Sequence, residues 1–324
     1  MGRGPRMFKA GEIYFVTTRT VQRRLLLRPD AYVNDIIGGV LAKGVLDYGI
    51  DLYGHAVLSS HLHLILSRLN EPERISDFMG WFKSNIAIKL GAHVDWKGPF
   101  WERRFVASPI IDDDALIERL CYILRHSVKE NLVSSPYEWP GVHCATQLAH
   151  GIKHVYNWHD WTRRSEALRK GEPFKEKEFK TAHTIDLEPL PCWQDLDEPE
   201  RQVKVRALID EIVEEEREKR RAEGKTVLDV AGIKAQHPHD KPKKDPVSTP
   251  RPLCHTTSKQ QREEYRTKYR AFCEDYAQAS TAYRAGNLTV AFPAEAFRPS
   301  LHPLRQQPHT LSPRSQAPPG SLAA

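Results

Sequence analysis

The chain has 324 residues and a mass of 37.2 kDa, which fits about two domains of ordinary size. Hydrophobic residues make up 40% and charged residues 28%, and no stretch approaches the roughly 18 uncharged apolar residues of a membrane helix, so we exclude a membrane-spanning protein. The net charge of +6 and the pI near 9.0 permit a nucleic-acid partner without requiring one. The five cysteines form no Cys-x-x-Cys pair, which argues against a disulfide framework and a structural zinc site, and we expect a cytoplasmic protein.

The first half of the chain alternates between strand-like and helix-like hydrophobic patterns. In chain order the predicted elements are a strand (12–18), a helix (29–48), the two strands of a hairpin (50–58 and 61–67), a helix (73–90), a strand (105–111) and a helix that begins after 112. This order predicts an α+β fold, an antiparallel sheet with packed helices of the ferredoxin-like or RRM-like kind.

The second half has a different composition. Pro, Lys and His enrich the segment 235–253, and a Tyr- and Arg-rich helix is expected from 258 to 284. We divide the chain into a first domain (1–150), a linker-like region (151–195), a mostly helical C-terminal extension (196–298) and a disordered Pro- and Ser-rich tail (299–324).

A His-x-His pair stands at the start of the strand 61–67. Because side chains alternate across a sheet, His61 and His63 point to one face while Leu62, Leu64 and Leu66 point to the other, into a core. Two imidazoles presented together are candidate metal ligands. Such a pair also occurs as ordinary structural or surface histidines.

The helix after residue 112 carries a tyrosine on its polar face. Tyr122 and His126 are neighbours one turn apart, opposite the apolar stripe, and the hydroxyl lies among Arg119, Arg125 and Lys129. This setting suits an anion such as a phosphodiester. The alternative is an exposed tyrosine on an ion-paired helix.

Four sequence blocks in the same order resemble those of REP-associated tyrosine transposases and other single-tyrosine insertion-sequence transposases. Residues 53–66, YGHAVLSSHLHLIL, resemble their HUH segment. Residues 15–19 are similar to the opening strand, 100–105 to the Trp-x-x-Arg-Phe block, and 122–133 to the catalytic-tyrosine helix.

The resemblance implies the HUH fold and a specific chemistry. Tyr122 would be the nucleophile, and His61 and His63 would hold a divalent ion with His126 as third ligand, where the family usually has an amide side chain. Single-strand DNA cleavage and rejoining would proceed through a 5′-phosphotyrosine. Mg²⁺ or Mn²⁺ suits phosphoryl transfer, and histidine ligation favours Mn²⁺.

The implied partner is single-stranded or hairpin-forming DNA, so the protein would be nucleoid-associated. The candidate DNA-binding residues are Arg19, Arg23, Arg24, Trp101, Arg103, Arg104, Arg119, Arg125 and Lys129. The Tyr- and Arg-rich helix is a candidate DNA-binding or homodimerising surface, although a solvated helix explains it more simply.

Two other functions fit the same residues. One is a DNA-binding protein of this family that has lost cleavage, because Ser60 and Ser127 replace the usual Asn and Pro beside the proposed ligands. The other is a metal-dependent nuclease that uses water as the nucleophile.

Overall fold

The computed structural model describes residues 4–68, 70–71, 73–171, 173–242 and 252–299. Its first half contains the strands β1 (Ile13–Arg19), β2 (Asp51–Leu58), β3 (His61–Ser67) and β4 (Val106–Ile110). They form one antiparallel sheet in the order β2-β3-β1-β4, with α1 (Ala31–Tyr48) between β1 and β2 and α2 (Arg74–His93) between β3 and β4. This βαββαβ arrangement is the ferredoxin-like topology, as predicted.

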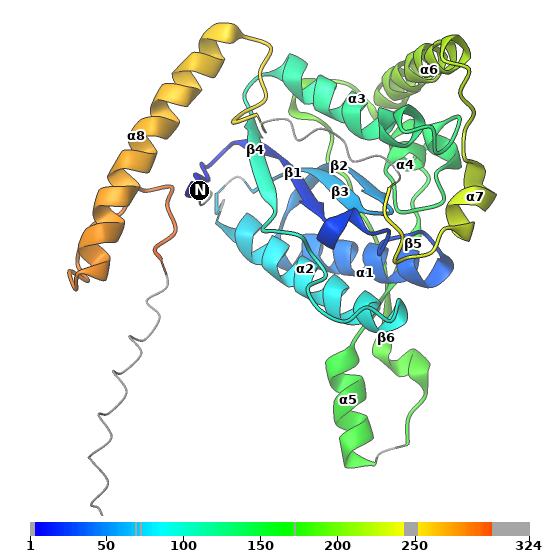
Figure 1. The fold of residues 1–324 in the computed structure, drawn as a ribbon, viewed down its shortest axis with the longest axis horizontal. Helices are drawn as coiled ribbons and strands as arrows, with labels where there is room; N and C mark the ends of the chain where they lie inside the picture. Colours follow the sequence, from blue (N-terminus) through cyan, green and yellow to red (C-terminus); the bar gives the residue numbers. More distant parts are fainter. Residues whose placement is uncertain (1–3, 69, 72, 172, 243–251, 300–324) are drawn as a thin grey trace, which may run out of the picture.

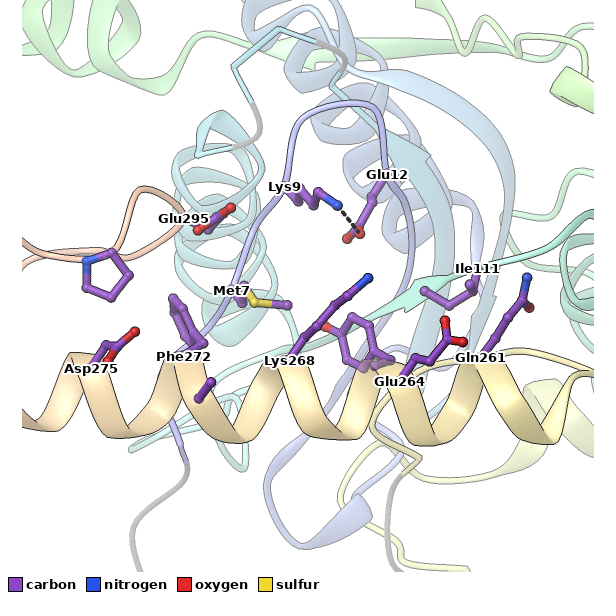
Figure 2. A pocket seen from close by; sticks show the side chains of 13 residues that line it. Met7, Lys9, Glu12, Ile111, Gln261, Glu264, Lys268, Phe272, Asp275 and Glu295 are labelled. Carbon is purple, nitrogen blue, oxygen red and sulfur yellow. Dashed lines mark ion pairs between the residues drawn. The ribbon is translucent and has the colours of Figure 1, made fainter.

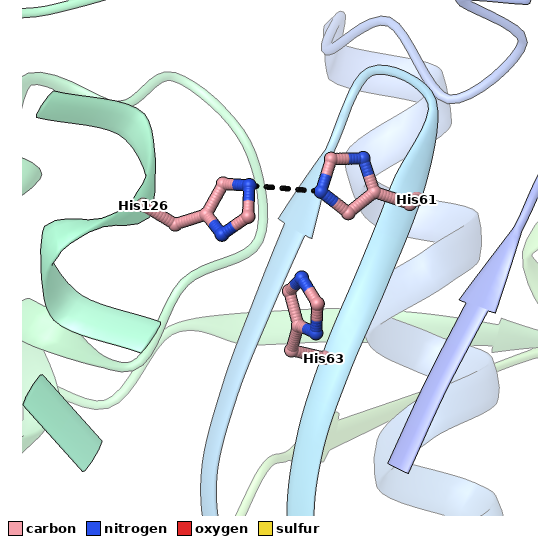
Figure 3. A group of neighbouring side chains, drawn as sticks. All are labelled: His61, His63 and His126. Carbon is pink, nitrogen blue, oxygen red and sulfur yellow. Dashed lines mark hydrogen bonds between the residues drawn. The ribbon is translucent and has the colours of Figure 1, made fainter. Parts of the chain in front are cut away.

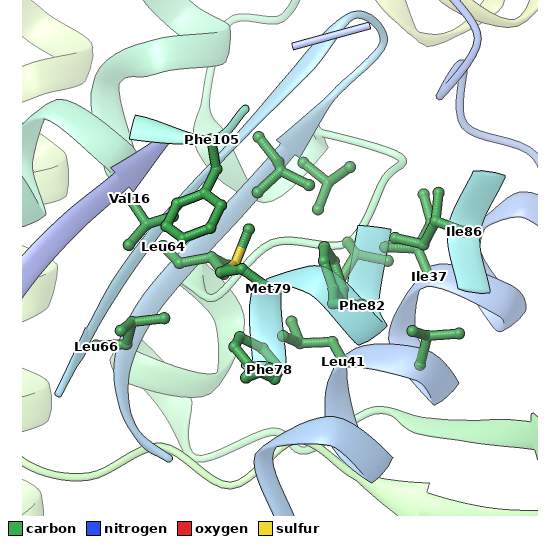
Figure 4. Close-up of a cluster of buried hydrophobic side chains, with 14 of the residues drawn as sticks. Val16, Ile37, Leu41, Leu64, Leu66, Phe78, Met79, Phe82, Ile86 and Phe105 are labelled. Carbon is green, nitrogen blue, oxygen red and sulfur yellow. The ribbon is translucent and has the colours of Figure 1, made fainter. Parts of the chain in front are cut away.

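Two helices cover one face of the sheet, and the larger core lies between them and the strands (Figure 1). Leu64 and Leu66 of β3 meet Phe78 and Phe82 of α2 there, all fully buried (Figure 4). The side chain of Asp30 accepts a hydrogen bond from the backbone N–H of Val33 and so caps the start of α1.

The other face of the sheet is covered by α3 (Asp113–Lys129), which is itself covered by the charged helix α6 (Glu198–Ala222). The buried apolar residues of α6 are Val205, Ile209 and Ile212. Because α3 lies between the sheet and α6, it is buried on two sides. His126, which the sequence places on a polar face, is only 7% exposed because its ring lies against His61 and His63 of β3.

The stretch 151–195, which we expected to be linker-like, contains regular structure after the short helix α4 (Ala145–His150). β5 (Val155–His159) and β6 (Lys180–Thr184) form a two-stranded antiparallel sheet, and α5 (Trp161–Lys170) lies between them in sequence. This sheet packs against α1. The strands are short and mostly polar, and the surface that they contact belongs to a helix more than a hundred residues earlier, so no local pattern predicts them.

A pair of glycines on α1 makes this contact close. A Cβ atom at Gly39 would lie 2.1 Å from the carbonyl oxygen of Asn157, and one at Gly38 would lie 2.2 Å from the ring of Tyr156. Real Cβ atoms do not approach so closely, so β5 packs against bare helix backbone. The small residues are therefore needed for packing, even though glycine lowers helix stability.

We expect Gly39→Ala to destabilise the protein by about 2 kcal/mol, because the methyl group forces β5 away from α1 and this outweighs the gain in helix propensity. The control is Gly80→Ala in α2, where no atom of the described residues lies within 4 Å of the added Cβ. That variant should be as stable as the parent or up to about 1 kcal/mol more stable. Urea unfolding of the three proteins checks this, and equal stability of the two variants would contradict the packing argument.

The C-terminal extension ends in two more helices, α7 (Asp229–Ala235) and α8 (Lys259–Arg284). α8 lies beside the body, next to the β4 edge of the sheet and the N-terminal segment (Figure 1). Thr256 and Thr257 anchor it through hydrogen bonds to Asp112, the N-cap residue of α3. The expected tail lies outside the described residues except for residue 299. None of the helices in the described ranges combines the length and apolar composition of a bilayer-crossing segment.

Candidate metal and tyrosine site

The strand β3 presents two imidazoles toward α3. His61 and His63 point to this face, and the leucines between and after them enter the core on the α1 and α2 side, as the alternation predicts. The register places Thr17 directly opposite His63 and Arg19 directly opposite His61. The face that carries the histidines therefore also carries residues of β1.

His126 of α3 joins these two imidazoles (Figure 3). One ring nitrogen from each of the three histidines lies within 4.8 Å of the others, and Nε2 of His61 is 2.9 Å from Nε2 of His126. Two cis ligands of an octahedral ion with metal–nitrogen bonds of about 2.1 Å are separated by about 3 Å. His61 and His126 are therefore spaced as two ligands of one cation would be, and His63 lies beside them.

All three imidazoles are held neutral. Burial, followed by the charges of Arg19 and Arg23, lowers the pKa of His61 to about 3. Burial, followed by neighbouring imidazoles, also places the pKa of His63 and of His126 well below the ordinary value. Neutral imidazoles keep the lone pairs that metal binding requires.

Two imidazole nitrogens of the triad lack hydrogen-bond partners within the described ranges, and this indicates what kind of group the site could bind. Nε2 of His63 and Nδ1 of His126 are buried without a hydrogen-bond partner among the residues that the structure describes. A cation bound among the three rings would take the lone pair of His63 Nε2, which otherwise has no partner at a buried position. The residues present therefore fit a divalent metal ion.

The ring of Tyr122 packs against this triad. Its centroid lies 5.2 Å from that of His63 and 5.0 Å from that of His126, both edge to face. Burial raises the pKa of Tyr122, while the nearby Arg119 guanidinium, 5.3 Å from the ring centroid, opposes that rise. The tyrosine is half-buried beside the histidines, unlike the exposed tyrosine of the alternative interpretation.

The predicted basic residues separate into two groups. Arg19 and Arg119 lie close enough to oppose the rise in the pKa of Tyr122. Arg125 turns away toward α6, where its Nη1 is 2.7 Å from Glu215 and 3.3 Å from Glu216. The helical spacing of α3 predicts that Arg125 lies beside Arg119 on the polar face. In the structure Arg125 instead forms ion pairs that link α3 to α6.

The remaining predicted DNA contacts lie around the loop after β1, in the segment before β4 and at the end of α3. Trp101 is half-buried and donates its Nε1–H to the Lys83 carbonyl, so only part of the indole is open to solvent. Arg24 donates to the carbonyl of His239. Arg103, Arg104 and Lys129 are exposed, and Arg23 is partly exposed.

Two residues of β1 that the sequence does not identify as site residues contact His63. Phe15 stacks on His63 at a centroid distance of 5.2 Å and an interplanar angle of 17°, and the Thr17 hydroxyl lies 2.9 Å from His63 Nδ1. The alternation of β1 puts residues 15, 17 and 19 on one face. Only the strand register shows that this is the histidine face.

A separate cavity of about 520 Å³ lies between α8 and the N-terminal segment (Figure 2). Lys9 and Glu12 form an ion pair at its edge. None of the three histidines lines it, nor does Tyr122.

The solved structures that are similar to this chain include two transposases. No protein-family model and no curated protein matches the chain. A REP-associated tyrosine transposase bound to a REP hairpin is 20% identical, with a TM-score of 0.41, over 47% of this chain and 88% of that chain. A putative transposase from Deinococcus radiodurans is 22% identical, with a TM-score of 0.28, over 38% of this chain and 94% of that chain.

Proposed function

We propose that this chain is a single-tyrosine transposase of the HUH kind, which cleaves and rejoins single-stranded DNA through a 5′-phosphotyrosine. The observation that carries the proposal is the contact of the Tyr122 ring with His63 and His126, two members of a neutral histidine triad. The resemblance of the four sequence blocks supports the same function.

His61, His63 and His126 would hold the metal. When bound, a divalent ion neutralises charge on the scissile phosphate and stabilises the transition state. The ligand set that these side chains offer is all nitrogen, with no carboxylate among the three. It therefore suits Mn²⁺ better than Mg²⁺, which prefers oxygen ligands.

Tyr122 would supply the attacking oxygen. The phenol gives its proton to water and its oxygen bonds to phosphorus, while the bond from phosphorus to the 3′ oxygen breaks. The released 3′ oxygen takes a proton from water and becomes a 3′-hydroxyl. Arg19 and Arg119 favour this step because their charges oppose the rise in the pKa of Tyr122. In the reverse step another 3′-hydroxyl loses its proton and attacks the phosphorus, the bond from phosphorus to the tyrosine oxygen breaks, and the tyrosine regains its proton, which rejoins the strands.

The DNA would be a single strand or hairpin that binds over basic residues exposed or partly exposed on the surface. We assign phosphate contacts to Arg23, Arg103, Arg104 and Lys129 in addition to the two arginines beside the tyrosine, and base stacking to the open part of Trp101. Residues 1–150 would carry this activity, in a nucleoid-associated and cytoplasmic protein.

The experiment is to incubate the protein with Mn²⁺ and a hairpin-bearing single-stranded oligonucleotide, labelled at either end, and to separate the products under denaturing conditions. We expect the 3′-end label to migrate with the protein and the 5′-end label to be released, because the tyrosine retains the 5′ phosphate of the downstream fragment. EDTA should abolish both products. Cleavage without an adduct would favour the water-using nuclease, and binding without cleavage would favour the DNA-binding protein.

A further inference from the structure

Two hydroxyl groups contact the metal-proximal histidines on the side away from the proposed ion. Thr17 Oγ1 lies 2.9 Å from Nδ1 of His63, and Ser60 Oγ lies 3.1 Å from Nδ1 of His61. In both rings the contacted atom is Nδ1. This leaves Nε2 of each ring directed at the triad.

A neutral imidazole has an N–H group at one ring nitrogen and a lone pair at the other. A hydrogen-bond partner at one nitrogen therefore determines whether the other nitrogen carries the proton or the lone pair. If the hydroxyl oxygen accepts a hydrogen bond from Nδ1–H, the lone pair must be on Nε2. We infer that Thr17 and Ser60 are positioning residues, which hold His63 and His61 in the Nδ1–H tautomer and aim their Nε2 lone pairs at the cation. This inference rests on the proposed metal-dependent function.

Thr17 should have the stronger effect of the two. It stands opposite His63 in the β1–β3 pairing, so its backbone is fixed by the sheet, whereas Ser60 belongs to the hairpin turn. His63 is 4% exposed, and Phe15 stacks on its ring, so water has little access to replace the hydroxyl. Losing such a partner of a metal-ligating histidine typically weakens metal binding by about 10- to 100-fold.

The test compares Thr17→Val, Thr17→Ser and Thr18→Val in the full chain. Valine keeps the shape of threonine and removes the hydroxyl, while serine keeps the hydroxyl. Thr18 is the matched control, because it is the next residue of β1 and points to the other face, opposite Leu62. Its buried Oγ1 has no hydrogen-bond partner in the described part of the chain. Mn²⁺ affinity is measured without DNA, by electron paramagnetic resonance of the free ion.

We expect Thr17→Val to weaken Mn²⁺ binding by about 10-fold or more, and Thr17→Ser and Thr18→Val to bind like the parent. Equal affinity of Thr17→Val and the parent would overturn the inference and leave the proposed function standing. Equal loss in Thr17→Val and Thr17→Ser would also overturn it, since the hydroxyl would not be responsible.

A second measurement tests the role of Thr17 independently of whether the three histidines bind a metal. Nitrogen-15 spectra of histidine-labelled, metal-free protein report the tautomer of each ring, and the His63 signal is identified by its loss in His63→Asn. We expect the Nδ1–H form for His63 in the parent and a shift away from it in Thr17→Val. A parent that binds no Mn²⁺ would refute the proposed metal site, whereas an Nε2–H form of His63 in the parent would refute the role of Thr17.

Discussion

Replacing Tyr122 by phenylalanine should abolish the covalent protein–DNA adduct and reduce strand cleavage on the order of 10⁴-fold or more, because the nucleophilic oxygen is removed. The substitution deletes only the hydroxyl. The ring contacts with Phe15, His63 and His126 do not involve that oxygen and should persist. We therefore expect unchanged folding, Mn²⁺ affinity and DNA affinity, measured by thermal unfolding, electron paramagnetic resonance and fluorescence anisotropy.

The matched control is Tyr137→Phe. Tyr137 is also partly buried, and burial raises its pKa as it does that of Tyr122, but it lies in a different element, the 3₁₀ turn Pro136–Glu138. This variant should cleave DNA like the parent. An adduct that survives in Tyr122→Phe would assign the nucleophile to another residue, and cleavage that survives without an adduct would indicate attack by water.

The parts of the site that the sequence predicts are those set by local periodicity. Strand alternation alone places His61 and His63 on one face, and helix periodicity alone places Tyr122 one turn before His126. Both predictions are confirmed by the structure, because neither depends on what packs against the element. The ferredoxin-like order of elements is confirmed for the same reason.

The parts that the sequence does not predict depend on partners far away in the chain. Arg125 is ion-paired because α6 covers α3, and the charged sequence of α6 does not reveal which helix it contacts. His126 is buried because its ring faces His61 and His63 of β3, which are more than sixty residues earlier in the chain. Thr17 joins the site only through the β1–β3 register. The β5–β6 sheet likewise depends on the bare backbone of Gly38 and Gly39.

Replacing His63 by alanine should abolish cleavage and weaken Mn²⁺ binding by at least about 100-fold, since a direct ligand is lost rather than one of its supporting partners. DNA affinity should change little, because phosphate contacts come from arginine and lysine side chains and His63 is neutral and 4% exposed. Metal titration, cleavage and anisotropy are measured on the same preparation. His154→Ala, at an exposed histidine, is the control and should match the parent in all three.

Together, Tyr122→Phe and His63→Ala show whether DNA cleavage requires the tyrosine, the metal ion or both. Tyr122→Phe should keep the metal and lose the adduct, whereas His63→Ala should lose both while still binding DNA. If His63→Ala loses the metal but still forms the adduct, the tyrosine acts without the ion and the histidines have a structural role. If His63→Ala cleaves and binds Mn²⁺ like the parent, the triad is not the metal site, and the unpartnered Nε2 of His63 needs another explanation.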